Sequence, residues 1–305
     1  MTINAMPFKN NKLVVILGPT ASGKSDLAIA LARKFKGEII SADSRQVYRG
    51  MDIGTGKVTK REQRLVPHHL LDVASPKKNY TVHHFQRDAR KAIRTIQQRG
   101  KLPILCGGTG FWIEAVLSDM ALPQVKPDAR LRVKLARLTA AQLYMRLKKL
   151  DSVRARSIDR HNSVRLIRAL EIVMTTRKPV PPLIGTSHYN ALIIGIRVPK
   201  KTLQKRIDTR LTKRLKQGMV AEVKRLLTQG VPAKRLIDLG LEYRYVTRCL
   251  QGKISRAEMQ AELAQAIKKY AKRQMTWFRG MEQKGFKIFW IQNAKQANIP
   301  VDKFV

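Results

Sequence analysis

The feature that most constrains this chain is a glycine-rich loop between an apolar segment and a segment with helical periodicity. Leu13–Leu17 is apolar and typical of a strand, and Asp26–Phe35 has the spacing of a helix. The loop between them reads Gly-x-x-x-x-Gly-Lys-Ser, the pattern of a phosphate-binding loop. The residues that we expect to surround a phosphate chain are Gly18, Pro19, Thr20, Ala21, Ser22, Gly23, Lys24 and Ser25.

The residue types in this loop suit a polyphosphate. Gly18 and Gly23 permit a tight turn, and the backbone amides from Thr20 to Ser25 are expected to point inward at the positive end of the following helix. Lys24 adds a point charge, and the hydroxyl of Ser25 can hold Mg²⁺. A chance glycine loop is the alternative, and the motif does not identify which phosphate compound binds.

Three further segments predict a parallel α/β sheet with its ligand site at one edge. Glu38–Ser41, Lys101–Cys106 and Ala191–Val198 have the character of short strands. Ligands of such sheets lie beyond the carboxyl ends of the strands, so Asp43 and Ser44 are expected to face the phosphate site. Asp43 could hold Mg²⁺ through water or accept a proton, or it could simply cap a helix.

The pattern of a motor-type ATPase is missing. Such enzymes have an apolar strand that ends in an aspartate, which helps to hold the metal. Here the strand Lys101–Cys106 is followed by Gly107-Gly108-Thr109-Gly110, and Ala191–Val198 is followed by a proline. A group transfer that uses a bound diphosphate or triphosphate remains open.

A basic helical segment interrupts the α/β pattern. From Asp128 to about Lys178 the spacing is helical and rich in arginine and lysine, and prolines stand on both sides. We therefore expect a core domain of residues 1–122 and 191–305 and an inserted helical domain of residues 123–190. A helical extension with a solvated basic face is the alternative.

Other helices are expected over Val82–Arg99, over Lys201–Gln217 with a continuation to Leu227, and over Ser255–Gly280. Arg206 and Arg210 lie four residues apart and would share one helix face, where they could reach a diphosphate. Trp277 and Phe278 could stack on bases, but at least one ring is expected in the core. The pairs His68-His69 and His83-His84 suit hydrogen bonding better than metal binding.

The charge of the chain points to a polyanionic partner. The 305 residues include 61 Lys and Arg against 21 Asp and Glu, a formal charge of +40. Neutralising phosphates releases counterions, so nucleic acid is a natural partner, although a generally basic surface is the alternative.

There is no signal-peptide pattern and no apolar run of membrane-spanning length. Cys106 and Cys249 lack metal-type spacing, which favours a reducing cytoplasm.

Several tracts together resemble one family. In order, they are Gly18–Ser25, Asp43–Thr55, Gly107–Gly110, Arg165–Glu171 and Arg273–Arg279. From about Leu13 to about Phe289 the chain is similar to the tRNA dimethylallyltransferases, also called tRNA isopentenyltransferases, of the bacterial type. The phosphate loop is shared by many families, but the joint match is specific.

The resemblance implies a fold and an activity. It implies a P-loop NTPase-like sheet with an inserted tRNA-binding domain, a cytoplasmic location and a monomer. It implies transfer of a dimethylallyl group from dimethylallyl diphosphate, with Mg²⁺, to the N6 amine of adenosine 37, which lies 3′ of the anticodon. The substrates would be tRNAs that read codons beginning with U, and diphosphate would leave.

The resemblance also implies roles for residues. Asp43 would hold the amine and act as general base, Thr109 would lie between the base and the donor, and Arg210 with Lys24 would neutralise the diphosphate. The residues that would contact tRNA are Asp43, Ser44, Arg45, Gln46, Thr109, Arg130, Val164, Arg165, Leu166, Ile167 and Arg168. Ser25 stands where many members have threonine, and Gly56 where alanine is frequent.

Two other functions stay open on the residues alone. A small-molecule or nucleotide kinase could use ATP in the same loop, although a small substrate gives no reason for a charge of +40. An RNA-binding module with an inactive loop is the other, although Lys24, Ser25, Asp43 and Thr109 are all intact.

Overall fold

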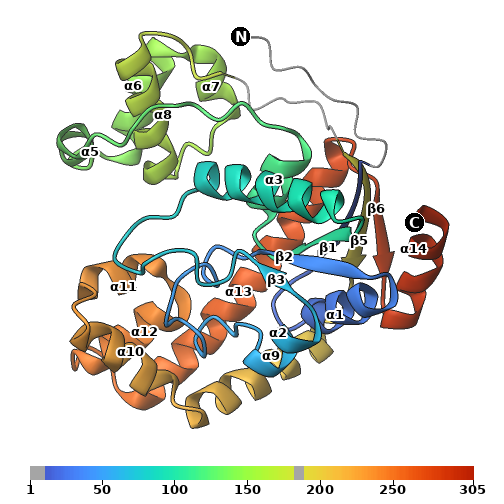
Figure 1. Ribbon diagram of the computed structural model, residues 1–305. Coiled ribbons are helices and arrows are strands. Elements are labelled where there is room, and N and C mark those ends of the chain that lie inside the picture. Colours follow the sequence, from blue (N-terminus) through green and yellow to red (C-terminus); the bar gives the residue numbers. More distant parts are fainter. Residues whose placement is uncertain (1–10, 182–188) are drawn as a thin grey trace. The chain divides into compact units, whose positions relative to one another are not determined.

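The computed structural model describes residues 11–181 and 189–305, which fall into two compact units (Figure 1). The first unit consists of Met1–Ser118 and Ser187–Val305, and the second of Asp119–Thr186. The second unit overlaps the predicted insert of residues 123–190 but begins and ends a few residues earlier.

The first unit is built on a six-stranded sheet in which all neighbouring strands are parallel. The strand order is β3-β2-β4-β1-β5-β6. This confirms the predicted parallel α/β sheet, and it adds a two-residue edge strand over the first histidine pair. The strands are β1 (Lys12–Leu17), β2 (Gly37–Ala42), β3 (His68–His69), β4 (Leu102–Gly107), β5 (Asn190–Ile196) and β6 (Ile288–Ile291).

Successive residues of a buried strand point to opposite faces of the sheet, so both faces must be covered. Helices cover both faces here. On β1, Val14 and Ile16 belong to a cluster with α1 (Lys24–Lys34) and α14 (Asn298–Phe304). The alternate residues Leu13, Val15 and Leu17 belong to a larger cluster on the other face. That cluster includes residues of α3 (Val82–Gln98), α4 (Gly110–Leu117), α9 (Lys200–Lys216), α10 (Met219–Thr228), α11 (Ala233–Leu239), α12 (Leu241–Leu250) and α13 (Arg256–Gln283).

The predicted helix over residues 201–227 is wrong as a single element. Gly218 has a φ of 96° and separates α9 from α10. A left-handed residue cannot continue a right-handed helix, and glycine adopts this conformation without steric cost. The helices predicted at Val82–Arg99 and Ser255–Gly280 are confirmed as α3 and α13. Short helices that the pattern did not predict are α2 (Lys60–Leu65), α4 and α14.

The second unit is helical and has its own small core. Its helices are α5 (Ala129–Leu135), α6 (Ala140–Leu150), α7 (Ser152–Ser157) and α8 (Ser163–Thr176). Leu143, Leu147, Leu166 and Leu170 are fully buried at its centre. The buried carboxylate of Glu171 accepts hydrogen bonds from Arg132 and Arg168, so part of the basic charge is used inside the unit.

Within the described ranges, none of the helices combines the length and the apolar character that crossing a bilayer requires.

Of the aromatic pair Trp277 and Phe278, Phe278 is fully buried, as expected for at least one ring. The histidines take hydrogen-bonding roles: His69 Nε2 lies 2.7 Å from Glu38 Oε2, and His84 closes the capping box of α3 with Thr81.

Glu38 is a buried acid on β2 that is surrounded by basic groups. Besides His69, its carboxylate contacts Arg99 Nη2 at 2.6 Å and Lys101 Nζ at 3.1 Å. Burial alone would raise the pKa of Glu38, but the hydrogen bonds from His69 and Lys101 and the charge of Arg99 outweigh burial and lower this pKa below its usual value of 4.5. The ionised carboxylate therefore ties β2 to β3 and to the start of β4.

We expect Glu38→Gln to lower the free energy of unfolding by about 1–3 kcal/mol at pH 7, because charged hydrogen bonds are lost. Since the folded pKa is lowered, the contribution is complete above about pH 4.5 and is lost as the pH falls through the folded value. Urea unfolding of both proteins between pH 7 and pH 3 should show the difference shrinking. A difference that stays constant over that range would contradict the ionised cluster.

Candidate active site

The loop between β1 and α1 has the shape of a phosphate-binding turn, with one departure from the expectation. The amide of Thr20 donates to Gln274 Oε1 at 2.9 Å, and the amide of Ser22 donates to the carbonyl of Pro19 at 3.3 Å. These two amides are therefore used by the protein. The first amides of α1, which begin at Lys24, have no partner within their helix and are the ones free to meet an anion.

Two observations on this loop point to a bound polar ligand. Ala21 has a φ of 62°, a conformation that is unfavourable for a residue with a Cβ and that occurs at functional turns. The hydroxyl of Ser22 is buried and has no hydrogen-bond partner among the described residues. A buried polar atom without a partner calls for an explanation, and a phosphate oxygen would supply one.

Asp43, Ser44 and Thr109 lie together beyond the ends of the adjacent strands β2 and β4. The amide of Thr109 donates to the carbonyl of Ala42 at 3.2 Å, and the amide of Ser44 donates to Thr109 Oγ1 at 3.1 Å. Asp43 Oδ1 accepts from the amide of Arg45 at 2.9 Å, which fixes the direction of the carboxylate by a local turn.

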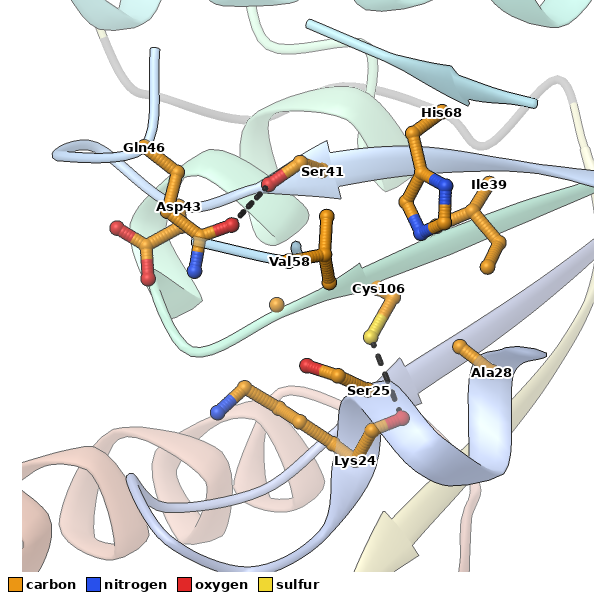
Figure 2. Close-up of a pocket in the computed structure, with 11 residues that line it drawn as sticks. Lys24, Ser25, Ala28, Ile39, Ser41, Asp43, Gln46, Val58, His68 and Cys106 are labelled. Carbon is orange, nitrogen blue, oxygen red and sulfur yellow. Dashed lines mark hydrogen bonds between the residues drawn. The ribbon is translucent and has the colours of Figure 1, made fainter. Parts of the chain in front are cut away.

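Lys24, Ser25 and Asp43 surround a common space (Figure 2). The Lys24 ammonium and the Asp43 carboxylate lie at the same end of this space, and the Ser25 hydroxyl lies between the helix and the loop that carries Asp43. Burial raises the pKa of the neighbouring Cys106 to about 12, so this thiol stays protonated and is not a nucleophile.

A cavity of about 1050 Å³ opens beside these residues. It is lined by Thr20, Lys24, Ser25, Asp43, Ser44, Arg45, Gln46, Thr109 and Arg210, residues that the sequence predicted for donor and RNA. Arg210 reaches the phosphate loop, where its Nη1 lies 3.4 Å from Thr20 Oγ1. Arg206, the other arginine expected to reach a diphosphate, is exposed and does not line the cavity.

Arg45 and Gln46 are held in place at the cavity wall. Arg45 Nε donates to the carbonyl of Leu239 at 2.8 Å. Gln46 accepts from Ser41 Oγ and donates from Nε2 to the carbonyl of Gly56, both at 3.3 Å. These contacts fix the orientation of the two side chains.

Sequence reasoning missed several polar residues of this cavity. Gln274 on α13 links the phosphate loop to the residue that follows β4, because its Oε1 accepts from the amide of Thr20 and its Nε2 donates to the carbonyl of Gly108 at 2.9 Å. Gln274 belongs to the tract Arg273–Arg279, so its place in a shared motif was the available signal. Burial raises the pKa of Tyr270, another lining residue, to about 12, which keeps its hydroxyl protonated and able to donate.

Glu222 on α10 supports the loop that faces the phosphate site. Its carboxylate accepts from the amides of Asp52, Ile53 and Gly54 at 2.7–3.0 Å and from the hydroxyl of Tyr243 at 2.9 Å. No feature of the sequence pairs this glutamate with a loop that lies so far away along the chain.

In the second unit the residues expected to touch tRNA differ in exposure. Arg130, Val164 and Arg165 are exposed and open to a partner. Leu166 is fully buried, so its side chain has a core role and the expectation of an RNA contact fails for it. Ile167 and Arg168 are half-buried, and Arg168 also donates to the carbonyl of Val125 at 2.9 Å.

Comparison with known proteins agrees with this geometry. Residues 46–281 match the model of a family described as IPP transferase. The tRNA dimethylallyltransferase 2 of Bacteroides fragilis is 44% identical over 301 residues, which cover 98% of this chain and 96% of that protein. The tRNA dimethylallyltransferase 1 of Geotalea daltonii is 45% identical over 92% of this chain and 91% of its own length.

Solved structures give the same result. The tRNA delta(2)-isopentenylpyrophosphate transferase of Staphylococcus epidermidis is 34% identical with a TM-score of 0.70, over 96% of this chain and 99% of that one. The tRNA isopentenylpyrophosphate transferase of Bacillus halodurans is 35% identical with a TM-score of 0.71, over 97% and 95%. The fold is thus P-loop NTPase-like, and the chain belongs to the IPP transferase family.

Proposed function

We propose that this enzyme transfers the dimethylallyl group of dimethylallyl diphosphate to the N6 amine of adenosine 37 in tRNAs that read codons beginning with U. Diphosphate is the other product. The observation that carries the proposal is the convergence of Lys24, Asp43, Thr109 and Arg210 on one cavity in a chain so similar to tRNA dimethylallyltransferases.

The donor's diphosphate occupies the phosphate loop. The first amides of α1, the Lys24 ammonium and the Arg210 guanidinium surround an anion there, and they stabilise the negative charge that develops as the carbon–oxygen bond breaks. The cavity volume of about 1050 Å³ leaves room for both an isoprenoid donor and an inserted base.

Asp43 accepts the proton of the adenine amine. An aromatic amine is a poor nucleophile, so a carboxylate that removes its proton as the new nitrogen–carbon bond forms lowers the barrier. Thr109, whose hydroxyl already accepts from the Ser44 amide, lies between base and donor. The adenine is unstacked from the anticodon loop to enter the cavity.

The Ser25 hydroxyl would hold Mg²⁺ in this reaction, together with diphosphate oxygens and water. Within the described residues no group of three or more His, Cys, Asp or Glu could hold a metal ion by itself. A site of few protein ligands fits Mg²⁺, which keeps several waters and is commonly held together with substrate phosphates. When bound, the ion would neutralise part of the charge on the leaving diphosphate.

The basic second unit grips the tRNA through its phosphates, which Arg130 and Arg165 can neutralise, and Val164 is a third exposed contact residue. A single chain is the proposed acting unit. The cytoplasm, where tRNA is abundant, is the proposed location.

A label-transfer experiment tests the proposal. The purified protein is incubated with unmodified tRNA and isotope-labelled dimethylallyl diphosphate, and a parallel reaction contains γ-labelled ATP instead. We expect label from the diphosphate donor in nucleosides isolated from tRNA and none from ATP. A tRNA whose adenosine 37 is replaced by guanosine is the matched control and should gain no label. Phosphate transfer from ATP without prenyl transfer would favour the kinase alternative.

We expect Asp43→Ala to reduce kcat by about 100-fold to 10,000-fold, since general-base catalysis is lost, while tRNA still binds. Asp26→Ala, which removes an exposed carboxylate from the first turn of α1, is the control and should keep its rate. Single-turnover kinetics and filter binding of tRNA measure the two effects. Unchanged turnover in the Asp43 variant would disprove the assignment of the base.

We expect Lys24→Ala to raise KM for dimethylallyl diphosphate by about 10-fold to 100-fold, because a charged hydrogen bond to the diphosphate is lost. The KM for tRNA should stay near the wild-type value. Arg33→Ala removes an exposed cation from the same helix and serves as the control. Equal losses for donor and tRNA would argue against a donor-specific role of Lys24.

A further inference from the structure

Arg214 is a buried arginine on α9 whose role neither the phosphate motif nor the proposed reaction explains. It lies four residues after Arg210, so both side chains leave the same face of the helix. Both line the large cavity. Only 7% of the surface of Arg214 is exposed, which is unusual for an arginine and requires partners for its N–H groups.

The partners of Arg214 lie on one edge of its guanidinium. Nη1 donates to the carbonyl of Gly54 and to Glu242 Oε1, each at 3.2 Å. The other end, Nη2, is buried and has no hydrogen-bond partner within the described ranges of the chain. Leaving a charged donor unpaired in a buried position is costly, so a ligand acceptor at Nη2 would remove a specific penalty.

The free end of Arg214 lies beside the end of Arg210. A Cβ placed on Gly56 would collide with Nη2 of both arginines, so the two guanidinium groups meet over this glycine. Arg210 in turn reaches Thr20 of the phosphate loop through Nη1. Two cations side by side repel each other, and an anion between them and the loop would relieve that repulsion.

Burial outweighs the effect of the carboxylates around Arg214. Glu242 is the carboxylate that contacts Arg214, and burial raises the pKa of Glu242 even though the charge of Arg214 opposes that shift. Burial also lowers the pKa of Arg214, with Glu242 and Asp43 acting in the opposite sense. Burial thus disfavours the charge of Arg214, and a bound anion beside Nη2 would stabilise that charge.

We propose that Arg214 is a second arginine of the diphosphate site, with Nη2 donating to a diphosphate oxygen of the donor beside Arg210. Glu242 is a positioning residue, because it holds the Nη1 edge toward Gly54 and so turns Nη2 to the ligand. The inference deepens the proposed function and rests on it for the identity of the donor. It commits to the diphosphate rather than an RNA phosphate because Arg210 links the pair to the phosphate loop.

Binding of inorganic diphosphate, with Mg²⁺ present, tests this contact without any transfer reaction. By calorimetry we expect Arg214→Met to weaken diphosphate binding by about 10-fold to 100-fold, the effect of losing a charged hydrogen bond. In steady-state kinetics KM for dimethylallyl diphosphate should rise similarly, and KM for tRNA should not change. Lys213→Met removes an exposed cation from the neighbouring position and should leave diphosphate binding unchanged.

Two conservative variants keep the test decisive if Arg214→Met is poorly folded, which thermal melting would reveal. Arg214→Lys keeps a charge but loses the planar guanidinium, so it should bind diphosphate more weakly than the wild-type protein and more tightly than a folded Arg214→Met. Glu242→Gln loses the charged anchor of Nη1 and should bind diphosphate more weakly than the wild-type protein, though less so than a folded Arg214→Met. Wild-type diphosphate affinity in folded Arg214→Met or Arg214→Lys, or a loss confined to tRNA binding, would overturn the inference.

The two proposals fail in different ways. A wild-type protein that binds diphosphate through Arg214 but transfers no dimethylallyl group to tRNA would refute the proposed function and leave the diphosphate contact intact. A wild-type protein that transfers the group while Arg214→Met binds diphosphate normally would refute only the role of Arg214.

Discussion

The register of the parallel sheet is the constraint on which the site depends. Leu17 of β1 pairs with Gly107 of β4, and Gly107 also pairs with Ala42 of β2. These residues end their strands at one level, so the chain leaves all three strands at the same edge. The phosphate loop, Asp43 and Thr109 are the next residues along the chain. Hydrophobic side chains on both faces of β1 fix this register, and the polar site follows from it.

Further contacts, which hold the loop from Asp52 to Lys57, shape the cavity at that edge of the sheet. The loop from Asp52 to Lys57 is held by Glu222 through backbone amides, by Arg214 through the carbonyl of Gly54, and by the buried Lys57 through its ion pair with Asp52. Each of these groups would be costly to bury alone, and each is paired with a loop atom instead. The loop is therefore preorganised, which reduces the reorganisation needed when a substrate binds.

The elements that could be predicted from the sequence are those whose signals are local. The strand Leu13–Leu17, the phosphate loop and helix α3 follow from apolar spacing and from glycine positions, and the structure has all three. The break at Gly218 was missed because a helical pattern on both sides conceals one left-handed residue. The use of the Thr20 amide by Gln274 was missed because it joins residues that are remote along the chain.

The contrast between local signals and long-range contacts also explains which cations of the site were predicted and which one was missed. Lys24 belongs to a motif and Arg210 was expected from the resemblance, but Arg214 stands among many basic residues of α9 with nothing in its neighbours to mark it. Its burial comes from long-range contacts with Gly54 and Glu242. In a chain with a formal charge of +40, the sequence alone does not single out the cations that belong to a site. The informative ones are those few for which the fold provides burial without full compensation, because only a bound anion completes their environment.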